Sequence, residues 1–199
     1  ARGVAGEGPP DARLMLVGER PGDREDLSGR PFVGPAGQLL DRALLDAGID
    51  RGAVTVPNAV KHFKWERRGK RRLHKNPSTS EIDACRWWIG LELDLLAPAA
   101  VVALGATAVR SLTGRSRSVT SLRAAPERLP GGALLFATVH PSSLQRLPDE
   151  AARRREYARF VADLAAARGC CEGGWALEPP TAQEMQRALA RNRKGAAAT

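Results

Sequence analysis

Three groups of residues in this sequence could do chemistry. "KRRLHKNPS" places His74 in a run of cations, "GERPGDRED" holds the carboxylates of Glu19, Asp23 and Asp26, and "HPSS" begins with His140. A neutral histidine can act as a nucleophile or a hydrogen-bond donor, and carboxylates can stabilise positive charge that develops in a reaction. Each group also has a simpler interpretation, because a solvated turn or a phosphate-contacting loop would contain the same residues.

The composition favours a nucleic-acid partner. The chain has 199 residues, 43% of them hydrophobic, and a formal net charge of +9 that attracts polyanions. No apolar run is long enough to cross a membrane and no signal-peptide pattern is present, so we expect a soluble intracellular protein. The three cysteines do not form a secreted disulfide framework, which leaves a metal role open.

Short apolar runs alternate with helical patterns along most of the chain. The apolar runs predict buried strands over 13–18, 53–60, 99–105 and 133–140. Leucine spacing and capping residues predict helices over 36–49, 106–112 and 149–167, with one more that opens at Ser78. This alternation predicts a three-layer α/β sandwich with a central four-stranded parallel sheet flanked by helices. We expect one domain over 1–167 and a tail of unknown role over 168–199.

Polar residues follow the predicted strands at the points where these strands end. Glu19 follows the first strand, Asn58 lies near the end of the second, the Gly105 turn follows the third, and His140 closes the fourth. Ligands of parallel α/β sheets bind beyond the carboxyl ends of the strands. The sequence therefore predicts that these four segments meet in one site.

Taken together and in order, the motifs resemble a known family. The matching segments are "GERPGDREDLSGRPFVGPAGQLLDRAL", "NAVKHFKW", "GKRRLHKNPS", "ACRWW", "VVALGATA" and "HPSSLQR". They are similar to the UdgX group in the iron–sulfur branch of the uracil-DNA glycosylase superfamily, and the resemblance covers about Arg13 to Ala166. The basic insertion with its histidine separates this group from its hydrolytic relatives. The resemblance implies a monomeric, cytoplasmic bacterial enzyme that acts on uracil-containing, single-stranded DNA.

The resemblance also implies roles for individual residues. Phe32 would stack on a uracil flipped out of the DNA, and Asn58 would read its edge. His140 would donate a hydrogen bond to the uracil oxygen that gains charge as the base departs. The residues expected to hold DNA or the gap left by the base are Lys70, Arg71, Arg72, Lys75, Ser142, Ser143 and Leu144.

His74 has the most distinctive implied role, because in UdgX the matching histidine attacks C1′ of the deoxyribose and remains bonded to it. Only a neutral imidazole can do so, and the neighbouring Arg71, Arg72 and Lys75 would favour that form. Glu19 could orient the imidazole by accepting a hydrogen bond, with Asp23 and Asp26 supporting the loop. The alternatives are a hydrolytic glycosylase that releases abasic DNA, and a non-catalytic binder of single-stranded or damaged DNA.

The sequence departs from the UdgX pattern at two points. Arg20 stands where the family commonly has glutamine. The family also holds a [4Fe-4S] cluster, to which His62 and Cys85 would supply two ligands here. The other two are an upstream cysteine pair that this sequence lacks. We expect truncation, with the cluster absent from the chain as given, or else a lost cluster and a buried Cys85 thiol. Cys170 and Cys171 do not match the family spacing.

Overall fold

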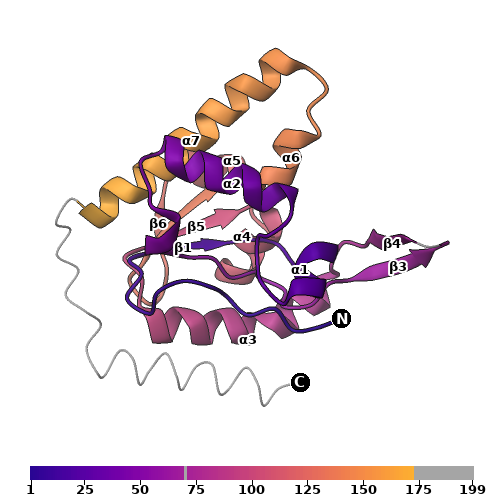
Figure 1. The fold of residues 1–199 in the computed structure, drawn as a ribbon. Helices are drawn as coiled ribbons and strands as arrows, with labels where there is room; N and C mark the ends of the chain where they lie inside the picture. The colour runs from indigo at the N-terminus through magenta and orange to yellow at the C-terminus, as the bar shows by residue number, and fades with distance from the viewer. Residues whose placement is uncertain (70, 173–199) are drawn as a thin grey trace.

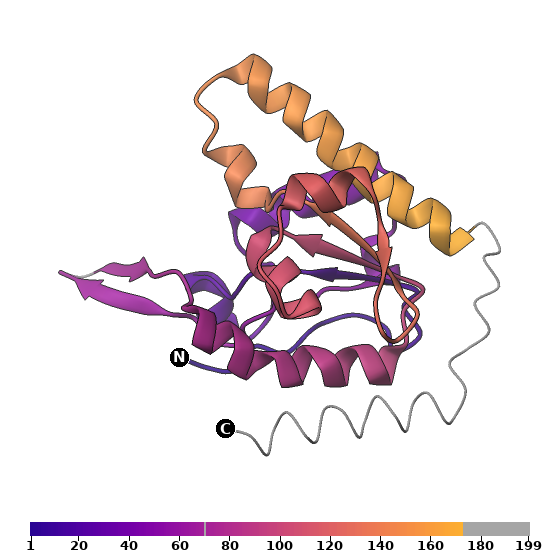
Figure 2. The same ribbon diagram turned by 180° about the vertical axis from the view of Figure 1, so that it is seen from behind.

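Residues 1–69 and 71–172 are described by a computed structural model, and their ribbon is drawn in Figures 1 and 2. The centre of the fold is a five-stranded sheet with the order β2-β1-β5-β7-β6. Its strands are β1 (Leu14–Val17), β2 (Val54–Thr55), β5 (Ala100–Leu104), β6 (Glu127–Arg128) and β7 (Leu134–Thr138). The first four strands in spatial order run parallel, which confirms the predicted parallel sheet. The short β6 extends it as an antiparallel edge strand.

Helices cover both faces of this sheet, as the strand–helix alternation predicts (Figure 1). One face packs against α2 (Pro35–Asp46), α6 (Pro141–Gln145) and α7 (Glu150–Glu172), and the other against α3 (Thr79–Leu96), α4 (Ala106–Thr113) and α5 (Val119–Ala124). Side chains alternate along β1, so Leu14 and Leu16 enter the first core while Met15 and Val17 enter the second. The short elements α1 (Asp23–Ser28) and η1 (Arg51–Ala53) lie in the connections.

The second strand is shorter than the apolar run at 53–60 predicts. Only Val54 and Thr55 pair continuously with β1. Val56 then bridges to Glu7, and its N–H donates to the Glu7 carbonyl at 2.9 Å. Pro57 has no N–H to offer to a ladder, which interrupts the regular pairing at this point.

The basic segment predicted as a loop is a β-hairpin instead. It consists of β3 (Trp65–Arg68) and β4 (Arg71–His74), which pair antiparallel as a separate sheet and project from the body beside α1 (Figures 1 and 2). All four residues of β3 are exposed, so no apolar–polar alternation marks the strand in the sequence. Gly69 lies in the turn with φ 60°, a conformation that glycine adopts without strain.

The start of α3 and the end of α7 can be compared with the elements predicted from the sequence. The Ser78 hydroxyl accepts the Glu81 N–H at 3.3 Å, which confirms the predicted capping box at the start of α3. The helix α7 continues past residue 168 to Glu172 and therefore includes Cys170 and Cys171. The rest of the predicted tail lies outside the described residues. Among those that are described, no helix is long and apolar enough to cross a membrane.

Candidate active site

An aromatic ring and an amide meet where β1 ends. Gly18 pairs with Asn58 through a single parallel bridge. A Cβ atom added to Gly18 would lie 2.4 Å from Asn58 Oδ1 and 2.5 Å from Phe32 Cζ, so both side chains face this glycine closely. Phe32 is 8% exposed and Asn58 is 3% exposed. A flat ring surface beside a buried amide can recognise a planar ligand with a polar edge.

The backbone of Phe32 is held in a strained conformation. Its φ is 56°, in the left-handed region that costs a side-chain-bearing residue about 1 kcal/mol. A Cβ atom on Gly37 would lie 1.7 Å from the Phe32 carbonyl oxygen, so this close approach requires glycine at position 37. The loop is thereby fixed with its aromatic ring against Gly18.

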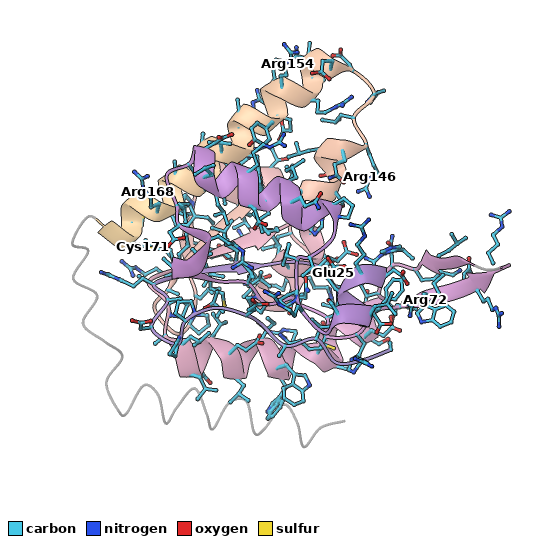
Figure 3. The ribbon with its side chains drawn as sticks, viewed as in Figure 1. Glu25, Arg72, Arg146, Arg154, Arg168 and Cys171 are labelled. Atoms are coloured by element: carbon cyan, nitrogen blue, oxygen red, sulfur yellow. The ribbon has the colours of Figure 1, made fainter. Side chains whose placement is uncertain are left out.

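Glu25 joins the loop after β1 to the loop that carries Phe32. Its carboxylate is 9% exposed and accepts the Gly22 N–H at 3.0 Å and the Gly34 N–H at 2.7 Å. Figure 3 shows Glu25 at the junction of the body and the hairpin. Glu25 is not among the site residues predicted from the sequence. Its place three residues after Gly22 has the capping-box spacing, but the sequence holds no signal for its contact with Gly34.

His140 lies beside the turn that follows β5. A Cβ atom on Gly105 would lie 3.2 Å from His140 Cβ, which brings these two strand ends together as predicted. The Ser142 backbone N–H donates to His140 Nδ1 at 3.2 Å, so Nδ1 is the acceptor and Nε2 carries the proton. Burial, and then the charges of Arg146 and Arg20, lower the pKa of His140 to about 4. The imidazole is therefore a neutral donor at neutral pH.

The turn after His140 corrects one predicted role. The Ser143 hydroxyl donates to the His140 carbonyl oxygen at 2.5 Å, and the Ser142 hydroxyl lies 2.8 Å from His140 Nδ1. Leu144 is 1% exposed and packs in the core between the sheet and α7. It faces inward because α6 turns this position toward the sheet. Leu144 is therefore not placed to fill a gap in DNA, contrary to the prediction.

Arg72 attaches the hairpin to α1. Its guanidinium contacts Asp23 Oδ1 at 2.5 Å and Asp26 Oδ2 at 2.6 Å. The same group lies 5.3 Å from the ring centre of Phe63 and 5.5 Å from that of Trp65. Arg72 is therefore engaged inside the protein rather than free for DNA phosphate. Asp23 and Asp26 of α1 thereby hold the hairpin through Arg72, which is labelled beside α1 in Figure 3.

His74 ends β4, two residues after Arg72. Its imidazole packs edge-on against Phe63 with ring centres 4.8 Å apart, and its Cε1 would lie 3.3 Å from a Cβ atom on Gly22. His74 as a whole nevertheless remains exposed to solvent. Partial burial of the ring, and then the charge of Arg20, lower the pKa of His74 against the opposing effect of the α1 carboxylates. The imidazole is therefore neutral at neutral pH.

Arg20 is a cation whose charge, after burial, lowers the pKa of His74. The Arg20 side chain is 11% exposed and forms an ion pair with Glu19. This pair replaces the predicted hydrogen bond between Glu19 and His74. The Glu19 backbone carbonyl accepts the Val60 N–H at 2.9 Å, which fixes the loop at the sheet edge.

The other predicted DNA contacts lie on the hairpin. Lys75 pairs with Glu66 at 2.8 Å, and both side chains are about half exposed. Arg71 is the first residue of β4, and Lys70 lies outside the described residues. The exposed Arg67 and Arg68 add charge on β3 that the sequence prediction omitted. The hairpin therefore presents cations toward solvent beside His74.

The predicted cluster ligands do not make a metal site on their own. His62 is exposed and bridges to Gly3, while Cys85 is half-buried on α3. Among the described residues, no group of three or more His, Cys, Asp or Glu residues is placed to hold a metal ion. Cys171 packs in the core on the α7 face of the sheet, and α3 covers the opposite face, so the α7 cysteines cannot join Cys85.

Comparison with known proteins agrees with this fold. Residues 5–165 match the model of the family described as the uracil DNA glycosylase superfamily, and the chain belongs to that superfamily. It is 39% identical over 152 residues to a protein of Thermotoga maritima named type-4 uracil-DNA glycosylase, covering 76% of each chain. A type-4 uracil-DNA glycosylase of Pyrobaculum aerophilum is 36% identical over 166 residues, covering 80% of each chain. A type-5 uracil-DNA glycosylase of Thermus thermophilus is 35% identical over 153 residues, covering 71% of this chain and 70% of that protein.

Proposed function

We propose that this protein excises uracil from DNA and that His74 then bonds to C1′ of the deoxyribose, as in the UdgX group. The names of the type-4 relatives support the glycosylase activity. The covalent step is supported by one observation above all. A neutral imidazole lies beside the acidic loop at the carboxyl end of the sheet, carried there by a hairpin that Arg72 attaches to the body.

Base recognition in this proposal takes place where the Phe32 and Asn58 side chains meet at Gly18. Uracil is a planar ring with donors and acceptors along its edge, which suits the Phe32 ring and the Asn58 amide. In this proposal His140 donates its Nε2–H to the base from the end of β7, which is separated from β1 by β5. Because its Nδ1 already accepts the Ser142 N–H, the imidazole has one orientation and needs no proton from solvent to donate.

Bond cleavage moves the electron pair of the N-glycosidic bond onto the uracil ring. The departing anion carries charge on an exocyclic carbonyl oxygen of uracil, where the His140 N–H stabilises it. The sugar is left as an oxocarbenium ion, which a nearby carboxylate such as Glu19 stabilises. The lone pair of a His74 ring nitrogen then forms the bond to C1′, and the resulting imidazolium loses the proton of its other nitrogen to solvent. No water is consumed in this sequence of steps.

A hydrolytic mechanism is the second candidate, and the type-4 names of the relatives favour it. In that case water attacks C1′, and the protein releases both uracil and DNA with an abasic site. His74 would then contact phosphate or lie in solvent at the edge of the site. The two candidates predict different products from one substrate.

The test is incubation with a uracil-containing single-stranded oligonucleotide, followed by denaturing electrophoresis and measurement of free uracil. The proposal expects an adduct that survives SDS, one uracil released per protein molecule, and loss of the adduct in His74→Ser. The same oligonucleotide with thymine in place of uracil is the control and should give neither product. Repeated turnover without an adduct supports the hydrolytic candidate. An adduct that persists in His74→Ser would refute the assignment of the nucleophile. Running the duplex in parallel measures the preference for single strands.

We further propose that His62 and Cys85 supply ligands to an iron–sulfur cluster. His62 directly follows Lys61, and Cys85 on α3 interacts electrostatically with Lys61. Iron and acid-labile sulfide should be found in the anaerobically purified protein and should be lost in Cys85→Ser. Equal iron content in the two proteins would exclude Cys85 as a ligand.

A further inference from the structure

Arg20 connects three parts of the site. It directly follows Glu19 after β1, and its guanidinium forms an ion pair with the Glu19 carboxylate. It also donates to Asn76 Oδ1 at 3.5 Å, and Asn76 is two residues beyond His74. The side chain is 11% exposed, which is unusually buried for a cation. One guanidinium therefore spans the sheet edge and the chain that leaves the hairpin.

We propose that Arg20 is a positioning residue that ties Glu19 to the chain following His74 and holds a fixed positive charge beside both imidazoles of the site. The geometry suits arginine, because its planar group can contact two oxygen acceptors from different segments at once. This inference rests on the proposed function, and it concerns a position where the UdgX pattern commonly has glutamine.

The electrostatics of both histidines support this role. Positive charge on Arg20 favours the neutral form of His74, opposed by Asp23 and Glu25 of α1. The same charge, together with Arg146, favours the neutral form of His140. Burial and Arg146 in turn lower the pKa of Arg20 itself, yet a guanidinium remains charged throughout the physiological range. Among the described residues, Arg20 thus acts electrostatically on both imidazoles.

The consequence is a wider pH range for the reaction. His74 attacks only as the neutral imidazole, so a lower pKa of His74 allows the attack to proceed at lower pH. A glutamine at position 20 could bridge Glu19 and Asn76 but would supply no charge. Arginine and glutamine at position 20 therefore differ in their charge rather than in their ability to form these hydrogen bonds.

The first test needs no DNA. The chain has three histidines, so their ring signals can be assigned by single substitution and titrated by NMR in wild type, Arg20→Gln and Arg20→Lys. We expect the pKa values of His74 and His140 to rise in Arg20→Gln and to stay low in Arg20→Lys, which keeps the charge. Unchanged values in Arg20→Gln would overturn the inference. If that variant does not fold, Arg20→Met provides a second neutral side chain with the same expectation.

The second test is the pH dependence of adduct formation by the same variants. The acidic side of the pH–rate profile should move to higher pH in Arg20→Gln. The rate of adduct formation then falls severalfold near about pH 6 and stays close to wild type near about pH 8. Arg20→Lys should restore the wild-type profile. An equal loss of rate at every pH would show a merely structural role and refute the electrostatic one. If wild type forms no adduct but the titrations shift as expected, the covalent function fails while the role of Arg20 stands.

Discussion

Replacing Glu25 by glutamine should both destabilise the protein and displace Phe32 from the proposed uracil site. The Glu25 carboxylate uses one oxygen for the Gly22 N–H at 3.0 Å and the other for the Gly34 N–H at 2.7 Å. Glutamine has a single acceptor oxygen, so its amide NH₂ must face one of these two donors. The variant keeps the size of the side chain and removes one acceptor from a site that is 9% exposed.

The expected cost follows from the two hydrogen bonds. Losing one charge-assisted bond and leaving a buried N–H without a partner costs about 3 kcal/mol in the free energy of unfolding. For a domain of this size, that corresponds to a decrease of about 6–12 °C in Tm. Gly34 lies between Phe32 and the first residue of α2, so a shift of Gly34 also displaces the Phe32 ring. We expect uracil release to fall about tenfold or more at a temperature where the variant is folded.

Thermal unfolding by circular dichroism measures the first effect, and uracil release at 25 °C measures the second. The matched control is Glu66→Gln, which makes the same chemical change in an ion pair with Lys75 on the hairpin surface. Because that side chain is 52% exposed, its substitution should cost less than about 1 kcal/mol. A Glu25→Gln variant with the same Tm as Glu66→Gln would show that the two glycine contacts do not stabilise the fold.

Two further predictions concern contacts in the same region. Asp26 accepts hydrogen bonds from a backbone N–H and from Arg72, which outweigh burial and lower its pKa. The carboxylate therefore stabilises the fold above its unfolded pKa and loses this contribution as the pH falls through the folded value. In urea titrations, Asp26→Asn should be less stable near pH 7 and less acid-sensitive below about pH 4; an unchanged pH profile would contradict this. Gly18→Ala places a Cβ atom 2.4 Å from Asn58 Oδ1 and should reduce uracil release at least tenfold, whereas Gly131→Ala, with no atom within 4 Å, should not. Equal activity of both alanine variants would exclude a base pocket at Gly18.

The difference between hairpin and loop shows what a sequence pattern can hide. Successive charged residues surround Gly69, and every residue of β3 is exposed, so neither hydrophobic periodicity nor a buried face marks the strands. What fixes the hairpin is a distant contact, the docking of Arg72 between Asp23 and Asp26. The inward direction of Leu144 has a similar origin, since it depends on where α6 meets the core.

The parallel sheet with helices on both faces could be predicted from the sequence. Apolar runs and helical spacing are local patterns, and the order of strands and helices leaves few topologies. The sequence also predicted that Glu19, Asn58, Gly105 and His140 lie at one edge of the sheet, and the structure brings Asn58 to Gly18 and His140 to Gly105. Which distant charged groups make contact could be seen only in the folded chain. The contacts of Arg20 with Asn76, of Arg72 with the α1 carboxylates, and of Glu25 with the Gly34 N–H depend on distances between separate segments, for which sequence spacing carries no information.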